Sequence, residues 1–438
     1  MKANSTFKRQ DLGSKRAALL WDESFLWGVM AYKALEACGL SFDLVRAEEV
    51  QQGILKDYAL VFVPGGWASN KMKALGDDGV EAIKCFVHDG GAYVGFCGGA
   101  GLATMDGIGL LHVKRRQTKE RVPSFSGPIR LKVQDHPLWE GVSDKENAAS
   151  ELRAQNSGPV FNAWWPSQFI VDGSVSVLAT YGEAMPDAFS SDVNVGDAET
   201  LGTWAELERS YQINLDPKRL LNEPAVIEGK FGAGTVVLSL VHFDTPGDQQ
   251  GARVLRNIWR YCGCDQILRE QDVASLKETQ LSLAPHHAAL SELEDAVTGL
   301  IDMGARNFLW FWKNPLLLQW RRGVRGLEYC SLAIMVRELT GLLGRPGREQ
   351  GSMDREQGLE RIRSLLLPFV EKAKHLLMRE RIAMQNAQIT YDRCDDQEIQ
   401  SIRDEMFSRS KSHGGMFKEL INELDLVLYA ELLRARQQ

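Results

Sequence analysis

The 438-residue chain lacks several features that would assign it to a familiar class of protein. Its seven cysteines include no Cys-x-x-Cys pair, which argues against a disulfide framework or a zinc module. Its 51 basic and 58 acidic side chains give a net charge of −7, so the charge balance does not predict general binding to nucleic acid. No apolar run reaches the roughly 18 residues of a membrane helix.

A secretory signal is also missing from the first residues. Residues 1–21 carry five Lys or Arg, but only residues 17–21 behind them are apolar. A signal needs an apolar stretch of roughly 7–15 residues. Hydrophobic residues make up 44% and charged residues 25%, as in ordinary globular proteins. We therefore expect a cytoplasmic protein, and the length suggests two or three domains.

Cofactor and metal motifs are absent as well. The chain has no Walker A loop, and no Gly-x-Gly-x-x-Gly with its acidic partner follows a predicted strand. Cys262-Gly263-Cys264 could bind a metal, but no other ligand cluster lies nearby in the sequence. We predict no cofactor and no metal.

Residues 1–264 alternate between predicted strands and helices, which predicts an α/β domain with a flavodoxin-like, doubly wound and mostly parallel sheet. The apolar runs at residues 59–63 and 92–96 are typical of buried central strands. Residues 113–230 contain short runs and many turn residues, which indicates an antiparallel excursion. Residues 235–241 predict the last strong strand, and a helix over residues 249–261 closes the domain.

Residues 265–438 have a different texture, rich in Leu, Arg, Glu and Ala, and predict a C-terminal α-helical bundle domain. Apolar residues spaced three and four apart predict amphipathic helices. These cover residues 288–303, 324–343, 359–391 and 396–436, with a polar, glycine-rich loop over residues 344–358.

The strongest chemical signal is the segment Gly95-Phe96-Cys97-Gly98-Gly99, which lies between an apolar strand and a predicted helix. A nucleophile elbow needs this layout, because the nucleophile sits on a strained turn whose close packing favours glycine. The N-terminus of the next helix favours a thiolate and can bind an oxyanion. The alternative is a buried structural cysteine in a glycine-rich turn.

Two further strand ends strengthen this signal. His242 follows the strand at residues 235–241, and Asp244 lies two residues beyond it. A cysteine nucleophile needs such a base and an acid to orient it, and parallel strands bring their carboxyl ends to one edge. Pro64-Gly65-Gly66-Trp67 ends the strand at residues 59–63 and could present backbone N–H groups to an intermediate. The alternatives are an ordinary loop histidine and an ordinary tight turn.

Taken in order, the Pro-Gly-Gly, Gly-x-Cys-x-Gly and His-x-Asp motifs resemble class I glutamine amidotransferase-like domains. Over about residues 15–262 the chain is most similar to the N-terminal domain of eukaryotic-type biotin–protein ligases, with further support from residues 155–162 (QNSGPVFN) and 229–244 (GKFGAGTVVLSLVHFD). The resemblance implies Cys97 as the nucleophile, His242 as the base and Asp244 as the orienting acid. Gly66 and Gly98 would be the oxyanion donors. It also implies substrate contacts from Gly65, Trp67 and Asn162.

Two departures bear on the reaction. Gly101 stands where working glutamine amidotransferases carry the Gln of their Gly-x-Cys-x-Gly-x-Gln pattern, and the acid is Asp instead of Glu. No synthetase domain and no biotin-ligase Gly-x-Gly-Arg-x-Gly segment is visible. We predict a Cys-dependent amidase or amidohydrolase that acts on a small amide. The alternative is a catalytically idle module that binds a metabolite or scaffolds a complex.

Residues 308–325 form an aromatic segment that ends in arginines. Trp and Arg are enriched at interface hot spots and at membrane boundaries, so the segment could dock onto a protein partner or a second copy of the chain. A membrane surface is the less favoured alternative. The remaining interpretation is a packed loop and helix inside the bundle. The residues concerned are Trp310, Trp312, Trp320, Arg321, Arg322 and Arg325.

Overall fold

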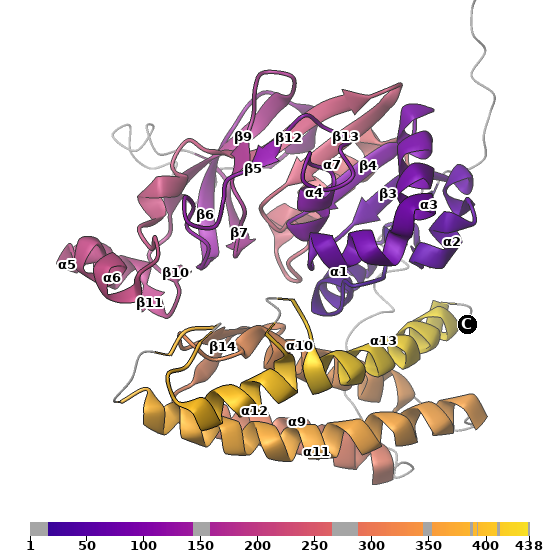
Figure 1. The fold of residues 1–438 in the computed structure, drawn as a ribbon. Coiled ribbons are helices and arrows are strands. Elements are labelled where there is room, and N and C mark those ends of the chain that lie inside the picture. The colour runs from indigo at the N-terminus through magenta and orange to yellow at the C-terminus, as the bar shows by residue number, and fades with distance from the viewer. Residues whose placement is uncertain are drawn as a thin grey trace, which may run out of the picture.

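The computed structural model describes residues 16–142, 158–264, 288–344, 353–385, 389–391, 393–409 and 412–436. Figure 1 shows a large twisted sheet with helices at both of its ends and a helical half below it. The predicted fold class, an α/β fold followed by a helical region, is confirmed. The boundary predicted between residues 264 and 265 adjoins a stretch outside the described residues and stays a prediction.

Five parallel strands form the part of the sheet that carries the predicted site. They lie in the order β2-β1-β3-β4-β13. This is the flavodoxin-like order, counted along the chain as 2-1-3-4-5. Almost all their side chains are buried, as expected of parallel strands covered on both faces. Their bounds are β1 Arg16–Leu20, β2 Phe42–Val45, β3 Tyr58–Val63, β4 Ala92–Phe96 and β13 Gly234–Ser239.

The antiparallel excursion extends the same sheet. β12 pairs antiparallel with β13, β9 with β12, and β6 with β9. Within the described residues, eleven strands form this sheet, and β5 pairs with β8 in a small separate one. The bounds are β5 Lys114–Arg115, β6 Phe125–Val133, β7 Val160–Trp164, β8 Phe169–Ile170, β9 Ser176–Ala184, β10 Phe189–Ser190, β11 Val193–Asn194 and β12 Pro224–Phe231.

The helices of this half show two features that the sequence patterns do not predict. A helix begins at Ala68, immediately after the Pro-Gly-Gly turn, and Gly76 at φ 58° kinks it. The middle region contains two short helices that its turn-rich sequence did not indicate, α5 and α6. The bounds are α1 Leu26–Ala37, α2 Ala47–Gln51, α3 Ala68–His88, α4 Gly98–Leu102, α5 Val195–Leu201, α6 Trp204–Tyr211 and α7 Gln249–Tyr261, with 3-10 turns η1 Ile54–Asp57, η2 Pro137–Trp139 and η4 Pro217–Leu220.

The helical half contains long helices where apolar spacing predicted them, with corrected ends. The helix expected over residues 359–391 starts earlier and ends earlier, so residues 353–358 of the expected loop are helical and residues 345–352 lie outside the described ones. The helix expected over residues 396–436 is two helices, because Ser408 at φ 58° and a Gly-Gly pair break it. The bounds are α9 Ala288–Arg306, α10 Gly326–Leu343, α11 Met353–Ala383, α12 Gln397–Phe407 and α13 Gly415–Arg436.

The aromatic segment is a β-hairpin instead of a loop and helix. β14 (Trp310–Asn314) pairs antiparallel with β15 (Leu317–Trp320). Asn314 closes the turn, since its side-chain oxygen accepts hydrogen bonds from the backbone N–H groups of Leu316 and Leu317, both at 2.9 Å. Trp310 is buried at 3% exposure and Trp312 is exposed at 36%. The arginines that end the segment are not all free to contact a partner, because Arg325 is buried against Glu328.

The helical half packs on the edge of the sheet at which the parallel strands end. Asp425 of α13 accepts a hydrogen bond from Trp21 Nε1 at 2.8 Å, and its other oxygen pairs with Arg46 Nη1 at 3.0 Å. Burial raises the pKa of Asp425 to about 7, and Arg46 opposes that shift. At the hairpin, Gln319 accepts a hydrogen bond from Ser126 Oγ at 2.8 Å. These contacts join segments that lie far apart in the chain (Figure 1).

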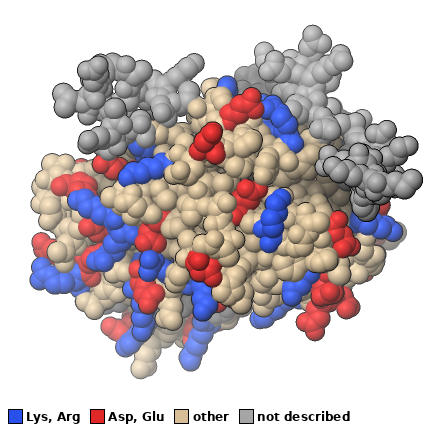
Figure 2. Space-filling view, turned by 90° about the horizontal axis from the view of Figure 1, so that it is seen from above, with Lys and Arg blue, Asp and Glu red and all other residues tan. Residues whose placement is uncertain are grey.

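The surface carries charges of both signs. Figure 2 shows Lys and Arg interspersed with Asp and Glu over the described part of the face seen from above. None of the described helices is long and apolar enough to cross a membrane.

The contact between α13 and the end of β1 gives a stability prediction. Asp425→Ala leaves Trp21 Nε1 and the Arg46 charge without their buried partner, and we expect the free energy of unfolding to fall by about 3 kcal/mol. Urea unfolding at pH 8.5, where the carboxyl is ionised, measures the loss. Leu426→Ala, one residue along α13 at a 55% exposed position, is the matched control and should cost less than about 0.5 kcal/mol. Equal losses in the two variants would contradict the assignment.

Candidate active site

Cys97 occupies a strained turn between β4 and α4. Its backbone has φ 51° and ψ −105°, a conformation that residues other than glycine seldom adopt, and its N–H donates to the Ser239 carbonyl at 2.8 Å. Its side chain is partly exposed, and Sγ lies 4.0 Å from the Trp164 carbonyl oxygen. α4 spans only five residues, so its dipole is small, and what the turn presents next to Cys97 is mainly its backbone N–H groups.

The Pro-Gly-Gly turn after β3 packs directly on this elbow. A Cβ atom on Gly98 would lie 1.7 Å from the Gly66 carbonyl oxygen, so no other residue fits without separating the two turns. Gly66 itself has φ 114°, in the region that favours glycine. Among the described residues, no backbone acceptor pairs with the N–H group of Gly66 or Gly98. Both N–H groups are therefore without a backbone acceptor beside the Cys97 turn, and their role as oxyanion donors stays a prediction.

His242 and Asp244 lie just beyond the end of β13, and both side chains are fully buried. His242 Nδ1 lies 2.8 Å from Asp244 Oδ1. Because an ionised carboxylate only accepts, Nδ1 carries the donated hydrogen. The indole of Trp27 stacks on the imidazole, with ring centroids 4.8 Å apart and planes at 27°. The ring is thus held at one edge by Asp244 and on one face by Trp27.

The registers of β3, β4 and β13 bring Cys97 and His242 to one edge of the sheet. Burial by itself lowers the pKa of His242, but the charge and hydrogen bond of Asp244, and a hydrogen-bonding contribution from Cys97, raise it to about 10. No described group lies at full hydrogen-bond distance and angle from Nε2. Cys97 thus lies within electrostatic reach of the imidazole.

Lys71, on the first turns of α3, lies beneath the Pro-Gly-Gly turn and was not predicted from the sequence. Its side chain is fully buried, and Nζ donates to the Asp22 carbonyl at 3.1 Å and to Ser24 Oγ. Burial lowers the pKa of Lys71 to about 7, opposed by Asp22, Glu23 and, more weakly, Cys97. No sequence motif marks Lys71 as part of the site.

The predicted substrate residues are placed differently from one another. Gly65 lies against Trp27, whose Cγ would be 2.8 Å from a Cβ at that position. Trp67 is half-buried at the start of α3. Asn162 accepts the His242 backbone N–H at 2.8 Å through its carbonyl. Their roles in binding stay predictions.

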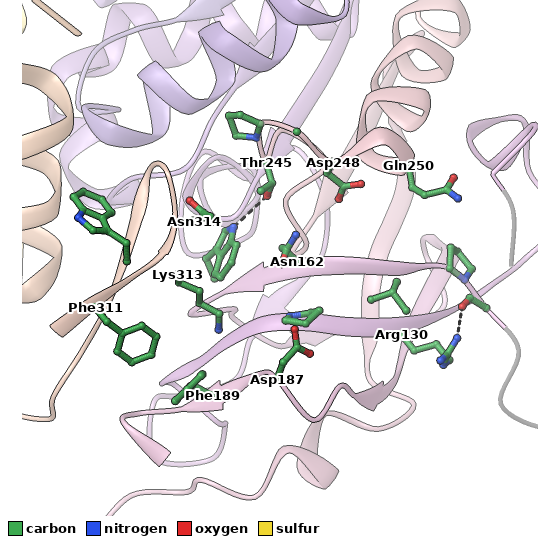
Figure 3. Close-up of a pocket in the computed structure, with 18 residues that line it drawn as sticks. Arg130, Asn162, Asp187, Phe189, Thr245, Asp248, Gln250, Phe311, Lys313 and Asn314 are labelled. Atoms are coloured by element: carbon green, nitrogen blue, oxygen red, sulfur yellow. Dashed lines mark hydrogen bonds between the residues drawn. The ribbon is translucent and has the colours of Figure 1, made fainter. Parts of the chain in front are cut away.

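A cavity of about 690 Å³ adjoins this site between the two halves (Figure 3). Figure 3 shows Phe311 and Lys313 of β14 and Asn162 of the α/β half on its walls. Trp164 contacts both places, since its carbonyl lies near Cys97 Sγ while its indole lines the cavity and donates to Thr245 Oγ1 at 3.2 Å. Cys97 and His242 do not line the cavity.

Comparison with known families identifies one match. A model described as the N-terminal region of biotin–protein ligase matches residues 48–106, which contain the Pro-Gly-Gly turn and Cys97. The predicted resemblance to the N-terminal domain of biotin–protein ligases is confirmed over these residues. None of the curated proteins compared with the chain matches it.

Solved structures include distant matches. A putative GMP synthase subunit from Thermoplasma acidophilum is 12% identical over 60% of this chain and 98% of its own, with a TM-score of 0.35. A putative ThuA-like protein from Bacteroides uniformis is 11% identical over 60% of this chain and 95% of its own, with a TM-score of 0.36. A β-galactosidase from Bacillus circulans sp. alkalophilus is 13% identical over 57% of this chain, which covers 31% of that enzyme, with a TM-score of 0.33. These matches assign no activity to this chain.

The buried pair gives a prediction on protonation. Asp244→Asn removes the carboxylate charge that opposes burial, so the pKa of His242 should fall from about 10 by at least about two units. Imidazole nitrogen chemical shifts of ¹⁵N-histidine-labelled protein measure the change over pH 5–11. Asp248→Asn, which alters the carboxylate that caps α7, is the control and should leave the His242 titration in place. An unchanged titration in Asp244→Asn would contradict the assigned pair.

Proposed function

We propose that the chain is a Cys-dependent amidase or amidohydrolase of the glutamine amidotransferase-like kind, acting on a small amide. The observation that carries the proposal is the strained Cys97 turn next to the buried His242–Asp244 pair. A protonated imidazole beside a cysteine favours the thiolate, which is the nucleophilic form. Protonated His242 supplies that charge and a proton to give away.

The proposed reaction has two halves. The Cys97 thiolate attacks the amide carbonyl carbon, and the oxygen takes the negative charge opposite the N–H groups of Gly66 and Gly98. His242 gives its Nε2 proton to the leaving nitrogen, the C–N bond breaks, and a thioester remains on Cys97. Water then attacks the thioester as His242 takes a proton from it. The carboxylic acid leaves, and the thiolate and the imidazolium are restored.

A catalytically idle module is the alternative, and one observation favours it. His242 and Asp244 are fully buried, and the helical half packs over the same edge of the sheet. A substrate would therefore have to reach Cys97 through its partly exposed side. In this alternative the domain binds a metabolite or scaffolds a complex, and the thiol has no activating partner.

The pH dependence of alkylation separates the two. Iodoacetamide modification of Cys97, followed by mass spectrometry of its peptide, should proceed well below pH 7 if an imidazolium–thiolate pair exists. His242→Gln should shift the profile to that of a free thiol, near pH 8.5. Cys85 is an internal reference, because it is exposed and its hydrogen bond with Glu81 raises the pKa of its thiol. If Cys97 follows an ordinary free-thiol profile in the unaltered protein, the domain is idle.

Turnover gives the second test. Ammonia release is measured from a panel of small primary amides that includes glutamine, asparagine, succinamate and butyramide. For any amide that is hydrolysed, Cys97→Ala should lower the rate by about 10³-fold or more, because the covalent route is lost. Cys85→Ala, at an exposed position away from the elbow, should retain the rate. Full activity in Cys97→Ala would remove the proposed nucleophile.

A further inference from the structure

The cavity in Figure 3 is enclosed by segments from both halves of the chain. β6, β7 and the start of β10 form one wall, the segment after β13 forms a second, and β14 of the hairpin forms a third. Its volume of about 690 Å³ is within the range of ~300–1,000 Å³ for small-molecule sites, which often lie between domains. The reaction proposed at Cys97 does not use this cavity.

Lys313 of β14 is held in the cavity by contacts across the interface between the halves. Its Nζ donates to the Ser126 carbonyl at 2.6 Å, and it lies 5.5 Å from the ring centre of Trp164 and 4.9 Å from that of Phe189. A Cβ atom at Gly127 would lie 2.6 Å from Nζ, so the glycine leaves room for the ammonium. An ammonium has three N–H groups, and the Ser126 carbonyl takes one of them. The others can donate to a ligand.

Charges of both signs line the cavity. Lys313 and Arg130 are the cations, and Asp187 and Asp248 are the carboxylates. Burial lowers the pKa of Lys313 to about 8 and Asp187 opposes that shift, although no described carboxylate forms an ion pair with the lysine. An anion in the cavity would lie near carboxylates, and a cation would lie near basic groups, each at a cost in free energy. A ligand without net charge avoids both costs.

The lining also offers hydrogen-bond donors and acceptors that other residues do not use. The side-chain amide of Asn162 has no hydrogen-bond partner among the described residues, and it supplies both a carbonyl acceptor and N–H donors. The ionised Asp187 side chain, likewise without a described hydrogen-bond partner, only accepts. Figure 3 shows both side chains between the end of the cavity at Lys313 and the end at Arg130. Hydroxyl groups suit such a mixed lining, because each both donates and accepts.

Phe311 supplies an apolar face at the same end of the cavity as Lys313 (Figure 3). The two residues are two positions apart on β14, so their side chains lie on the same face of the strand. Phe311 packs on Phe189 with ring centroids 5.6 Å apart, yet its side chain is 49% exposed. The face of an aromatic ring carries negative charge and attracts polarised C–H groups. A ligand that packs C–H groups on this face removes apolar surface from water.

We propose that this cavity is a binding site for a neutral saccharide. A sugar ring has C–H groups on one face, hydroxyl groups at its rim and no net charge. The C–H face packs on Phe311, and the hydroxyl groups hydrogen-bond to Asp187, Asn162 and Lys313. Cys97 does not line the cavity, so saccharide binding stands independently of the proposed amidase function.

Saturation-transfer NMR on the full chain tests the site with glucose, galactose, mannose, maltose and lactose as probes. At least one of these sugars should bind saturably, with a dissociation constant in the millimolar range or below. The uronate and the 2-amino sugar that correspond to the bound ring should each bind at least about tenfold more weakly, because each adds a charge beside a like charge. This comparison uses the unaltered protein and needs no variant to fold.

Two substitutions locate the sugar within the cavity. Phe311→Ala and Asp187→Asn should each weaken binding about tenfold or more, because the first removes the aromatic face and the second a charged acceptor. Phe308→Ala, three residues earlier at an 80% exposed position outside the cavity, is the matched control and should bind as the unaltered protein does. Thermal melting of each variant shows that it is folded.

Three results would overturn the proposal: no sugar of the panel binds at tens of millimolar, the charged counterparts bind as tightly as the neutral ring, or both cavity variants keep full affinity. The amidase proposal fails separately, by its own alkylation and turnover tests. Cys97→Ala should bind the sugar with unchanged affinity, because the thiol lies outside the cavity. Loss of binding in Cys97→Ala would place the sugar at the thiol and contradict the assignment to the cavity.

Discussion

The site depends on one contact between two backbones, that of the turn after β3 and that of the turn after β4. With only hydrogen on the Gly98 α-carbon, the Gly66 carbonyl reaches a distance that any side chain would forbid. This contact keeps Cys97 in its strained conformation and leaves the N–H groups of both glycines without backbone partners among the described residues. The strained turn at Cys97 and two N–H groups without backbone acceptors are thus consequences of the same packing.

The helical half contributes to the site through aromatic rings. Trp320 of the hairpin stacks on Trp165 at 4.7 Å, Trp165 meets Trp27 edge-on at 6.1 Å, and Trp27 stacks on His242 at 4.8 Å. A continuous series of packed rings therefore connects β15 with the imidazole. Because packed rings repack only at a cost, the position of the hairpin constrains the orientation of His242. The aromatic segment therefore packs, through Trp320, on a tryptophan of the same chain.

The sequence predicts the parts of the site that follow strands, because a strand end leaves a local pattern. An apolar run followed by glycines marks Gly66 and Cys97, and the run before His242 marks the third strand end. Lys71 carries no such pattern, since it reaches the Pro-Gly-Gly turn only through contacts with Asp22 and Ser24, which lie about fifty residues earlier in the chain. The sequence does not distinguish the hairpin from a loop and helix, because its apolar residues are too few to separate the two-residue period of a strand from the 3.6-residue period of a helix. Local chemistry is readable from the chain, but the charges around it depend on the tertiary structure.

The surroundings of Cys97 combine positive groups of two kinds. Asp244 holds the pKa of His242 well above the usual range of an imidazole, at about 10. Lys71, on the side of the Pro-Gly-Gly turn, has a pKa of about 7 and loses its charge as the pH rises through neutrality. As the pH rises through neutrality, the positive charge on Lys71 therefore falls while that on His242 remains.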